Sequence, residues 1–370
     1  MTPPLSLSIE RRLEVPRWLP ALTTIGAVAV AFVISGLVIV VVGGDPIRSY
    51  QHMLSASFGS PGVISDTLVK ATPLILTGLA CALAFRARLW NIGAEGQFFV
   101  GAWGASAVVL FPLVPVGTSP FITIPLMMLA GFAAGAAWGF IPGVLRARFG
   151  VNEIITSLML NYIAINWNLY WVFGPWSERG FQLSPQFPRE AWLPRLTDFS
   201  KAVPDLGGLT VHLGLVFGLV AAVILWFVLR RGRWGYEIRL IGDNPRAARY
   251  AGVNIARNTI LVFMLSGGLA GLAGMAEVSG VVHRLQGAIS PGYGFTAIIV
   301  AYLAKFHPLG VVVAAVLFGA LILAGREIQP SGIPQMIQGV ILFTLITSDV
   351  LLRYRLRLRR HSPAAAVAAA

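Results

Sequence analysis

The chain has little charge for its length. Only 12% of its 370 residues are Asp, Glu, Lys or Arg and 56% are hydrophobic, whereas soluble domains carry about 25% charged residues. This composition leaves too little polar surface to cover a globular protein, so the surplus apolar surface must face lipid. The class is therefore an integral membrane protein.

Cysteine and catalytic motifs are also lacking. Cys81 is the single cysteine and lies in an apolar run, which excludes a disulfide framework and a cysteine-based zinc site. The sequence contains no Walker A, HExxH or GxSxG pattern. We therefore expect no catalytic residue, no metal site, no cofactor and no ATPase site in this chain.

Long apolar runs, by contrast, are abundant. A bilayer span needs about 20 apolar residues. About ten candidates occur, at 21–42, 63–85, 89–111, 120–145, 151–173, 209–229, 258–278, 292–306, 309–325 and 335–352. The predicted fold is an all-α bundle of about ten transmembrane helices.

The positive charges predict the orientation of these spans. Most of the 28 lysine and arginine residues lie in alternate loops and in the termini, which places those loops and both termini in the cytoplasm. The charges form short runs between apolar stretches and no continuous basic face, so nucleic acid is not an expected partner.

This topology divides the chain into three parts. Residues 1–20 form a cytoplasmic N-terminal segment, residues 21–352 the transmembrane domain, and residues 353–370 a basic and then alanine-rich cytoplasmic tail. Within the transmembrane domain, residues 174–208 form the longest outer loop, which is either a docking surface or a folded lid over helix ends.

Two glycine strips predict close helix packing. Gly131, Gly135, Gly139 and Gly143 are spaced four apart, and so are Gly267 and Gly271. Residues four apart share a helix face, and small residues let helix backbones approach closely within lipid. Both strips are interpreted as structural.

Polar residues within spans are candidates for function because intramembrane charge is costly. Asp66 and Lys70 are four apart and can pair with each other. Asn161, Tyr162 and Asn166 combine amides and a ring that suit a base or a sugar, but interhelical hydrogen bonding explains them equally well.

The stretch RARLWNIGAEGQFFVGAW, residues 86–103, places polar groups at the start of the third span. Asn91 can cap a helix, while Gly93 and Gly96 allow its first turn to bend. A second break is expected near SPGYGF, which contains Tyr293. Breaks in comparable positions of two halves indicate an inverted repeat of helix bundles and mark a transporter's substrate path. Glu95 and Gln97 then face either that path or a neighbouring helix, where an arginine could pair with Glu95.

The inner loop 230–257 contains a short helix. Asn244 can cap the helix that Pro245 opens, and Gly252 can end it. Arg246 projects charge from this helix. The loop is either a docking helix for a partner or a basic loop that faces lipid.

Six stretches together resemble a known family. LWNIGAEGQFFVGAW, ARFGVNEIITSLMLNYIA, YEIRLIGDNPRAARYAGVN, LSGGLAGLAGMAEV, SPGYGFTAIIVAYLAKFHPLG and IQGVILF occur in this order. Together they resemble the permease subunits of ABC importers for simple sugars and nucleosides, a group that also contains branched-chain amino-acid and ribose permeases. Ala304, Lys305 and Phe306 depart from the glycine and basic residue that relatives carry before HPLG.

This resemblance implies an importer subunit in the bacterial cytoplasmic (inner) membrane. It implies ATPase subunits that use ATP, a second and non-identical permease chain, and an extracytoplasmic binding protein that delivers the substrate. The segment GDNPRAARYAG matches the family's ATPase-coupling loop, which assigns coupling to Gly242, Asn244, Arg246, Ala247 and Ala248. NIGAEGQ and the long outer loop look most like nucleoside permeases, with a ribose-like sugar as the alternative substrate.

Two other classes stay open from the residues alone. An ion-coupled secondary transporter needs carboxylates near the membrane midplane, for which Asp66, Glu95 and Glu277 are the candidates. An intramembrane enzyme or a membrane scaffold is the other class, although the sequence shows no catalytic pair.

Overall fold

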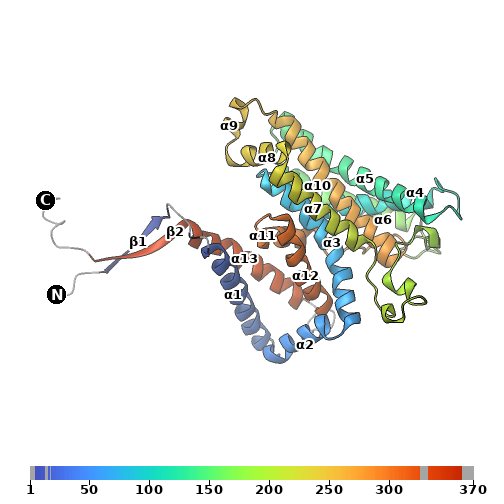
Figure 1. The fold of residues 1–370 in the computed structure, drawn as a ribbon, viewed down its shortest axis with the longest axis horizontal. Helices are drawn as coiled ribbons and strands as arrows, with labels where there is room; N and C mark the ends of the chain where they lie inside the picture. The colour runs from blue at the N-terminus through green and yellow to red at the C-terminus, as the bar shows by residue number, and fades with distance from the viewer. Residues whose placement is uncertain (1–4, 13–15, 17, 326–331, 361–370) are drawn as a thin grey trace. The chain divides into compact units, whose positions relative to one another are not determined.

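Helices make up nearly all of the computed structural model, which describes residues 5–12, 16, 18–325 and 332–360 (Figure 1). The α-helices are α1 (Leu19–Val41), α2 (Pro46–Phe58), α3 (Pro61–Arg86), α4 (Ala94–Leu110), α5 (Pro120–Phe149), α6 (Glu153–Phe173), α7 (Gly214–Arg231), α8 (Arg233–Asp243), α9 (Pro245–Tyr250), α10 (Ile255–Glu277), α11 (Tyr293–Leu303), α12 (Pro308–Ala324) and α13 (Ile333–Arg353). Three 3₁₀ helices, η1 (Arg189–Ala191), η2 (Leu196–Phe199) and η3 (Pro204–Leu206), and a π-helix, η4 (Val278–Val282), complete the helical elements.

Each of the ten apolar runs expected to span the membrane contains a helix. Within the described residues, six helices are long and apolar enough to cross a bilayer, namely α1, α3, α5, α7, α10 with η4, and α13. The helices α11 and α12 are shorter apolar helices. The chain is thus a multi-pass, helical membrane protein, and the count of ten spans stays a prediction.

One short sheet is added to the helical fold at the two ends of the described chain. Strand β1 (Leu5–Arg11) pairs antiparallel with β2 (Tyr354–Arg360), so that Leu5 lies opposite Arg360. The sequences LSLSIER and YRLRLRR alternate apolar and polar residues, the period of a strand. The alanine-rich end of the tail, 361–370, lies outside the described residues.

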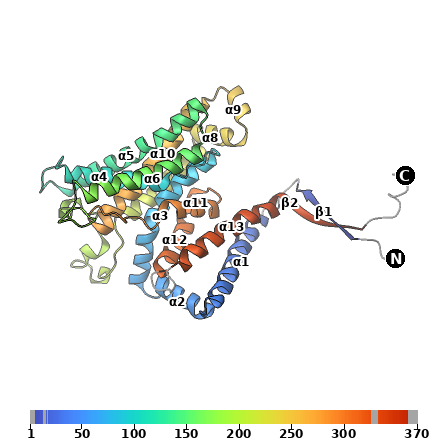
Figure 2. The same ribbon diagram turned by 180° about the vertical axis from the view of Figure 1, so that it is seen from behind.

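The chain divides into two compact units. Met1–Arg48 and Gly332–Ala370 form one unit, in which α1 packs against α13. Ser49–Ser331 form the other, which contains α3 to α12 (Figure 2).

Helix α3 is the central helix of the larger unit. It contacts α7, α10, α11 and α12, and 94% of its most apolar window is buried. The corresponding buried share is 33% for α5 and 28% for α7, so these helices leave apolar faces on the outside of the unit.

The two predicted glycine strips pack directly against each other, as α5 against α10. A Cβ atom added at Gly135 would lie 2.3 Å from the Gly267 carbonyl oxygen, and one added at Gly271 would lie 2.2 Å from the Gly131 carbonyl oxygen. Only glycine permits such an approach. The expectation of a structural role is confirmed.

The two long loops lie at opposite ends of the larger unit. Helix α9 precedes the first residue of α10, whereas the loop with η1 to η3 contacts the far end of α10, as Figures 1 and 2 show. This arrangement agrees with the expectation that 230–257 and 174–208 face opposite sides of a membrane.

Candidate functional site

The break before α4 is held in shape by two side chains of α6. The Ile92 amide donates to Ser157 Oγ at 3.2 Å, Asn161 Nδ2 donates to the Ile92 carbonyl at 2.9 Å, and the Gly96 amide donates to Asn161 Oδ1 at 2.8 Å. Ser157 and Asn161 are one turn apart and share a face of α6. These bonds satisfy backbone groups that an interrupted helix leaves without helical partners. Asn161 therefore makes the interhelical hydrogen bonds that the sequence offered as one of two explanations.

Asn91 and Gln97 form a buried amide pair behind this break. Asn91 Nδ2 donates to Gln97 Oε1 at 2.9 Å and to Ser266 Oγ of α10 at 2.8 Å. Asn91 Oδ1 accepts from the Gly93 amide at 3.0 Å. Gly93 is the N-cap of α4 and makes no side-chain cap hydrogen bond, so Asn91 closes a turn before the helix and does not itself occupy the cap position.

Glu95 connects the two interrupted helices. Its Oε2 accepts from the Gly294 amide of α11 at 2.6 Å, and the Ser290 hydroxyl is a second hydrogen-bond partner. A Cβ atom at Gly294 would lie 2.2 Å from the Glu95 amide nitrogen. The start of α11 thus lies directly on the start of α4. In the described part of the chain, no arginine pairs with this carboxylate.

Lys70 provides a positive charge next to this contact. Its Nζ lies 3.7 Å from Glu277 Oε1 of α10 and donates to the Tyr293 hydroxyl at 3.3 Å. All three side chains are buried. The expected pair of Lys70 with Asp66 is therefore wrong. Asp66 accepts instead from Thr210 Oγ1 at 2.6 Å, in the segment that precedes α7.

Five of the seven residues predicted to line the substrate path thus lie around one junction, where α3, α4, α10 and α11 meet. They are Asn91, Glu95, Gln97, Asn161 and Tyr293. Tyr162 and Asn166 do not join them. Tyr162 is 60% exposed on the outer face of α6, and Asn166 donates to the Tyr162 carbonyl.

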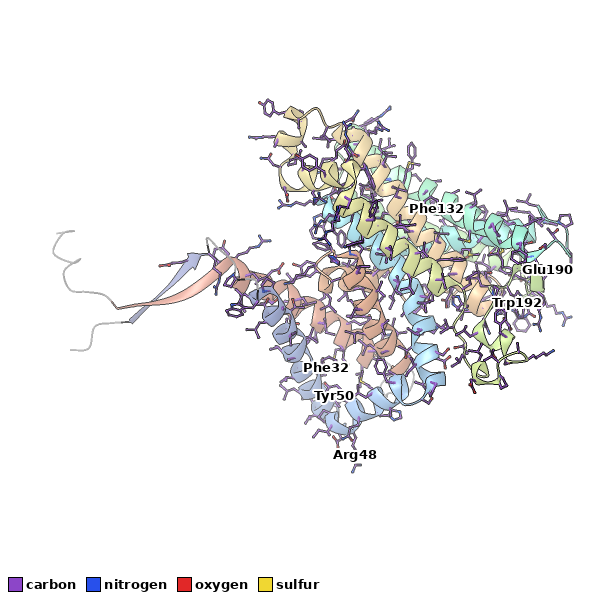
Figure 3. All side chains as sticks on the ribbon, viewed as in Figure 1. Phe32, Arg48, Tyr50, Phe132, Glu190 and Trp192 are labelled. Atoms are coloured by element: carbon purple, nitrogen blue, oxygen red, sulfur yellow. The ribbon has the colours of Figure 1, made fainter. Side chains whose placement is uncertain are left out.

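The outer loop is hydrogen-bonded to η4, which continues α10. Arg195 donates to the Gly280 carbonyl at 2.7 Å and to the Val281 carbonyl at 3.1 Å, within the π-helix η4. Trp192, which Figure 3 labels, stacks on His283 with ring centroids 3.7 Å apart. The outer loop is thus folded as a lid against the end of α10, and a docking role for its surface stays a prediction.

Two histidines that pack against this lid, His212 and His283, are kept neutral. Burial, together with the positive charge of Arg195, lowers the pKa of His212 to about 3 and the pKa of His283 to about 4. Their ordinary value is 6.5. Both imidazoles therefore lack a proton at neutral pH.

The inner loop folds as its capping residues predict. Asn244 Oδ1 accepts from the amides of Arg246 and Ala247 at 3.0 and 3.1 Å, and Gly252 follows α9 with a φ of +74°. Arg246 is exposed, so its charge is available to a partner.

Two other residues assigned to coupling have a packing role. Gly242 is buried, and a Cβ atom there would lie 2.5 Å from the Arg86 carbonyl oxygen. Ala248 is the buried residue of α9. Gly242 thereby fixes α8 to the end of α3.

Sequence reasoning missed several residues of these sites. Ser157 could have been found because it lies one turn before Asn161, whereas Ser266 and Ser290 carry no signal in the sequence. Tyr250, which is 94% exposed on α9, could have been noted as an aromatic residue in a charged helix.

The family follows from comparison with known proteins. The model of the family described as "Branched-chain amino acid transport system / permease component" matches residues 63–347. The chain belongs to this family. All six motifs that carry the resemblance lie within or overlap this range.

Individual relatives within this similarity are named as ABC transporter permeases. The chain is 36% identical to the glucose ABC transporter permease protein TsgB13 of Haloferax volcanii, over 94% of this chain and 93% of the relative. It is 36% identical to the guanosine ABC transporter permease protein NupP of Bacillus subtilis, over 84% and 88%. It is 32% identical to the nucleoside ABC transporter permease protein NupB of Lactococcus lactis, over 86% and 88%. Each of these organisms also has a second, less similar relative with a matching transporter name.

Proposed function

We propose that this chain is the permease subunit of an ABC importer that carries a nucleoside into the cell. The observation that supports this substrate is its similarity, over more than four fifths of the chain, to two permeases named for guanosine or nucleosides. A simple sugar is the second candidate, because the relative named for glucose matches equally well and over a larger share.

The proposed substrate path runs beside the junction of the two interrupted helices. Asn91, Glu95, Gln97, Asn161 and Tyr293 gather there with the Lys70–Glu277 pair, inside the bundle. Irregular backbone at membrane depth is tolerated only where it is buried in protein or lines a cavity. Rocking of the helices at this junction would open the path to one side of the membrane at a time. Tyr162 and Asn166 lie away from the junction and would contact lipid or a neighbouring chain.

The proposed partners follow from the two ends of the larger unit. ATPase subunits would dock on α9, where Arg246 is exposed, and would bind and hydrolyse the ATP, so that this chain needs no cofactor. An extracytoplasmic binding protein would dock on the lid formed by 174–208. A second, non-identical permease is supported by the paired relatives in each of three organisms.

The proposed location is a bacterial cytoplasmic membrane, with about ten spans and both termini inside. The bias of lysine and arginine supports this orientation. A reporter fused within 174–208 is expected outside the cell, and a cytoplasmic reporter there would contradict the map.

The decisive test is uptake by proteoliposomes that contain this chain, its second permease, the ATPase subunits and the binding protein. ATP-dependent uptake of labelled guanosine is expected, with ribose and glucose as competitors. Uptake of a sugar without any nucleoside would overturn the substrate. Uptake by this chain alone, without ATPase subunits, would favour an ion-coupled transporter instead.

A further inference from the structure

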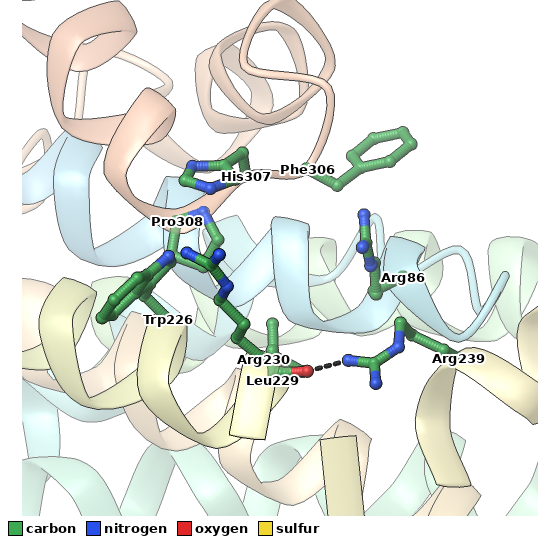
Figure 4. Close-up of a pocket in the computed structure, with 8 residues that line it drawn as sticks. All are labelled: Arg86, Trp226, Leu229, Arg230, Arg239, Phe306, His307 and Pro308. Atoms are coloured by element: carbon green, nitrogen blue, oxygen red, sulfur yellow. Dashed lines mark hydrogen bonds between the residues drawn. The ribbon is translucent and has the colours of Figure 1, made fainter. Parts of the chain in front are cut away.

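A basic pocket lies where the ends of several helices meet, away from the α4–α11 junction. Its volume is about 340 Å³, and eight residues line it: Arg86, Trp226, Leu229, Arg230, Arg239, Phe306, His307 and Pro308 (Figure 4). Three arginines and a histidine face this pocket, and none of the eight residues is acidic. The pocket volume lies near the lower end of small-ligand sites, which range over about 300–1,000 Å³.

No carboxylate of the described chain pairs with the three arginines. Arg239 donates to the Leu229 carbonyl, and the Arg230 guanidinium lies 5.4 Å from the centre of the Trp226 ring. Neither contact neutralises charge. Like charges held in one pocket repel each other, so their arrangement is stabilised when an anion binds between them.

Other arginines at the same end of the bundle have acidic partners. Arg146 lies 3.3 Å from Glu153, and Arg233 lies 3.4 Å from Glu237. The three pocket arginines have no such partner in the described chain, so a bound anion can balance their charge.

The start of α12 adds to the positive potential. Pro308 is the first residue of this 17-residue helix and lines the pocket. A helix N-terminus carries a partial positive charge. Guanidinium groups and a helix N-terminus together form a site of the kind that holds phosphate.

The walls of the pocket are suited to the membrane interface. Trp226, Leu229 and Phe306 supply apolar surface next to the charges. Arg86 ends α3 and Arg230 lies in the last turn of α7, both at ends predicted to face the cytoplasm. Aromatic side chains prefer the level of the lipid headgroups, and basic pockets between spans on the cytoplasmic side hold anionic headgroups.

We propose that this pocket binds a phosphate group, and that the phosphate belongs to the headgroup of an anionic phospholipid in the cytoplasmic leaflet. The same chemistry would accept free phosphate from the cytosol, and the experiment separates the two sources. The proposal does not depend on the transported substrate.

The test measures phospholipid binding to the purified, delipidated full chain by native mass spectrometry. Dioleoyl phosphatidylglycerol, dioleoyl phosphatidylcholine and inorganic phosphate are titrated separately. The double variant Arg86→Gln with Arg230→Gln removes two exposed charges that donate no hydrogen bond within the described chain. Arg148→Gln, an exposed arginine at the end of α5 outside the pocket, is the matched control.

The wild type is expected to prefer phosphatidylglycerol to phosphatidylcholine. The double variant should bind phosphatidylglycerol about 30-fold more weakly, since each basic residue near an anionic lipid contributes about 1 kcal/mol, or about fivefold. Arg148→Gln should bind as the wild type does. Replacement of both pocket arginines by lysine should restore most of the affinity, which separates loss of charge from misfolding.

Three results would overturn the proposal. Equal binding by the double variant and the wild type, or equal loss in Arg148→Gln, would show that the pocket is not the lipid site. Arginine-dependent binding of inorganic phosphate, with no preference between the two lipids, would exclude the lipid as the source.

Discussion

Glu95 offers the sharpest test of how the two interrupted helices are held together. The substitution Glu95→Gln changes little in size but replaces a carboxylate by a neutral amide. In the structure, the carboxylate accepts a hydrogen bond from the Gly294 amide at 2.6 Å and another from Ser290. Both donors belong to the segment that begins α11.

The expected loss follows from two contributions. A hydrogen bond to a charged group contributes about 1.5–3 kcal/mol and a neutral one about 0.5–1.5, a difference of about 1–1.5 kcal/mol. An anion at a helix N-terminus adds about 0.3–1 kcal/mol. The sum of about 1.3–2.5 kcal/mol corresponds to a shift of about 9- to 70-fold in the equilibrium between docked and undocked α11.

Two assays on the reconstituted transporter measure this effect. We expect Glu95→Gln to lower both the rate of substrate uptake and the thermal stability of the detergent-solubilised complex. Glu190→Gln makes the same change of charge in the outer loop (Figure 3), on a side chain that forms no hydrogen bond with the other described residues, and should leave both unchanged.

Each contrary result has a distinct meaning. Normal uptake and normal stability in Glu95→Gln would refute the anchoring role. Lost uptake with wild-type stability would also refute it, and would place Glu95 in contact with the substrate instead.

Three further predictions concern packing, coupling and pH. Gly271→Ala should destabilise the chain by about 1–3 kcal/mol, because the new Cβ atom would lie 2.2 Å from a backbone oxygen of α5. Gly26→Ala is the control, because a Cβ atom there would have no atom within 4 Å. Equal melting temperatures of Gly271→Ala and Gly26→Ala would contradict the packing. Arg246→Glu should leave membrane insertion intact but separate ATP hydrolysis from uptake, and unchanged ATP-driven uptake would count against docking at α9. His212 and His283, which pack against the lid, have pKa values lowered from 6.5 to about 3 and about 4. When the lid unfolds, both histidines bind protons below pH 6.5 that they do not bind in the folded state, so the stability of the lid should fall from pH 6.5 towards pH 4 by up to about 1.4 kcal/mol per pH unit and per histidine. Amide hydrogen exchange in 174–208 that is equal at pH 7 and pH 5, after correction for the intrinsic rate, would refute this.

Much of the fold is local and could be read from the sequence. Apolar runs predict helices because a bilayer offers no other partner to backbone groups. Asn244 and Pro245 predict the start of α9 because a side-chain acceptor and a fixed φ act within one turn. The strand pair β1–β2 was missed, although its alternating pattern is present, because its two strands lie at opposite ends of the sequence.

The partners of the buried charged side chains could not be predicted from the sequence in this way. Asp66 and Lys70 share a helix face, so the sequence favours a pair between them, yet Lys70 reaches Glu277 on another helix. Which partner a long side chain finds depends on what packs beside it, and no local rule contains that information.

The sequence by itself determined that this is a membrane protein, where its helices lie, which residues break them, and to which permease family it belongs. These properties depend on composition, on residues a few positions apart, and on motifs in a fixed order. The tertiary structure alone decided that the breaks before α4 and α11 touch, that Asn161 supports one of them, and that three arginines from α3, α7 and α8 surround a pocket. Those contacts join residues far apart in the chain, and only the packing of whole helices brings them together.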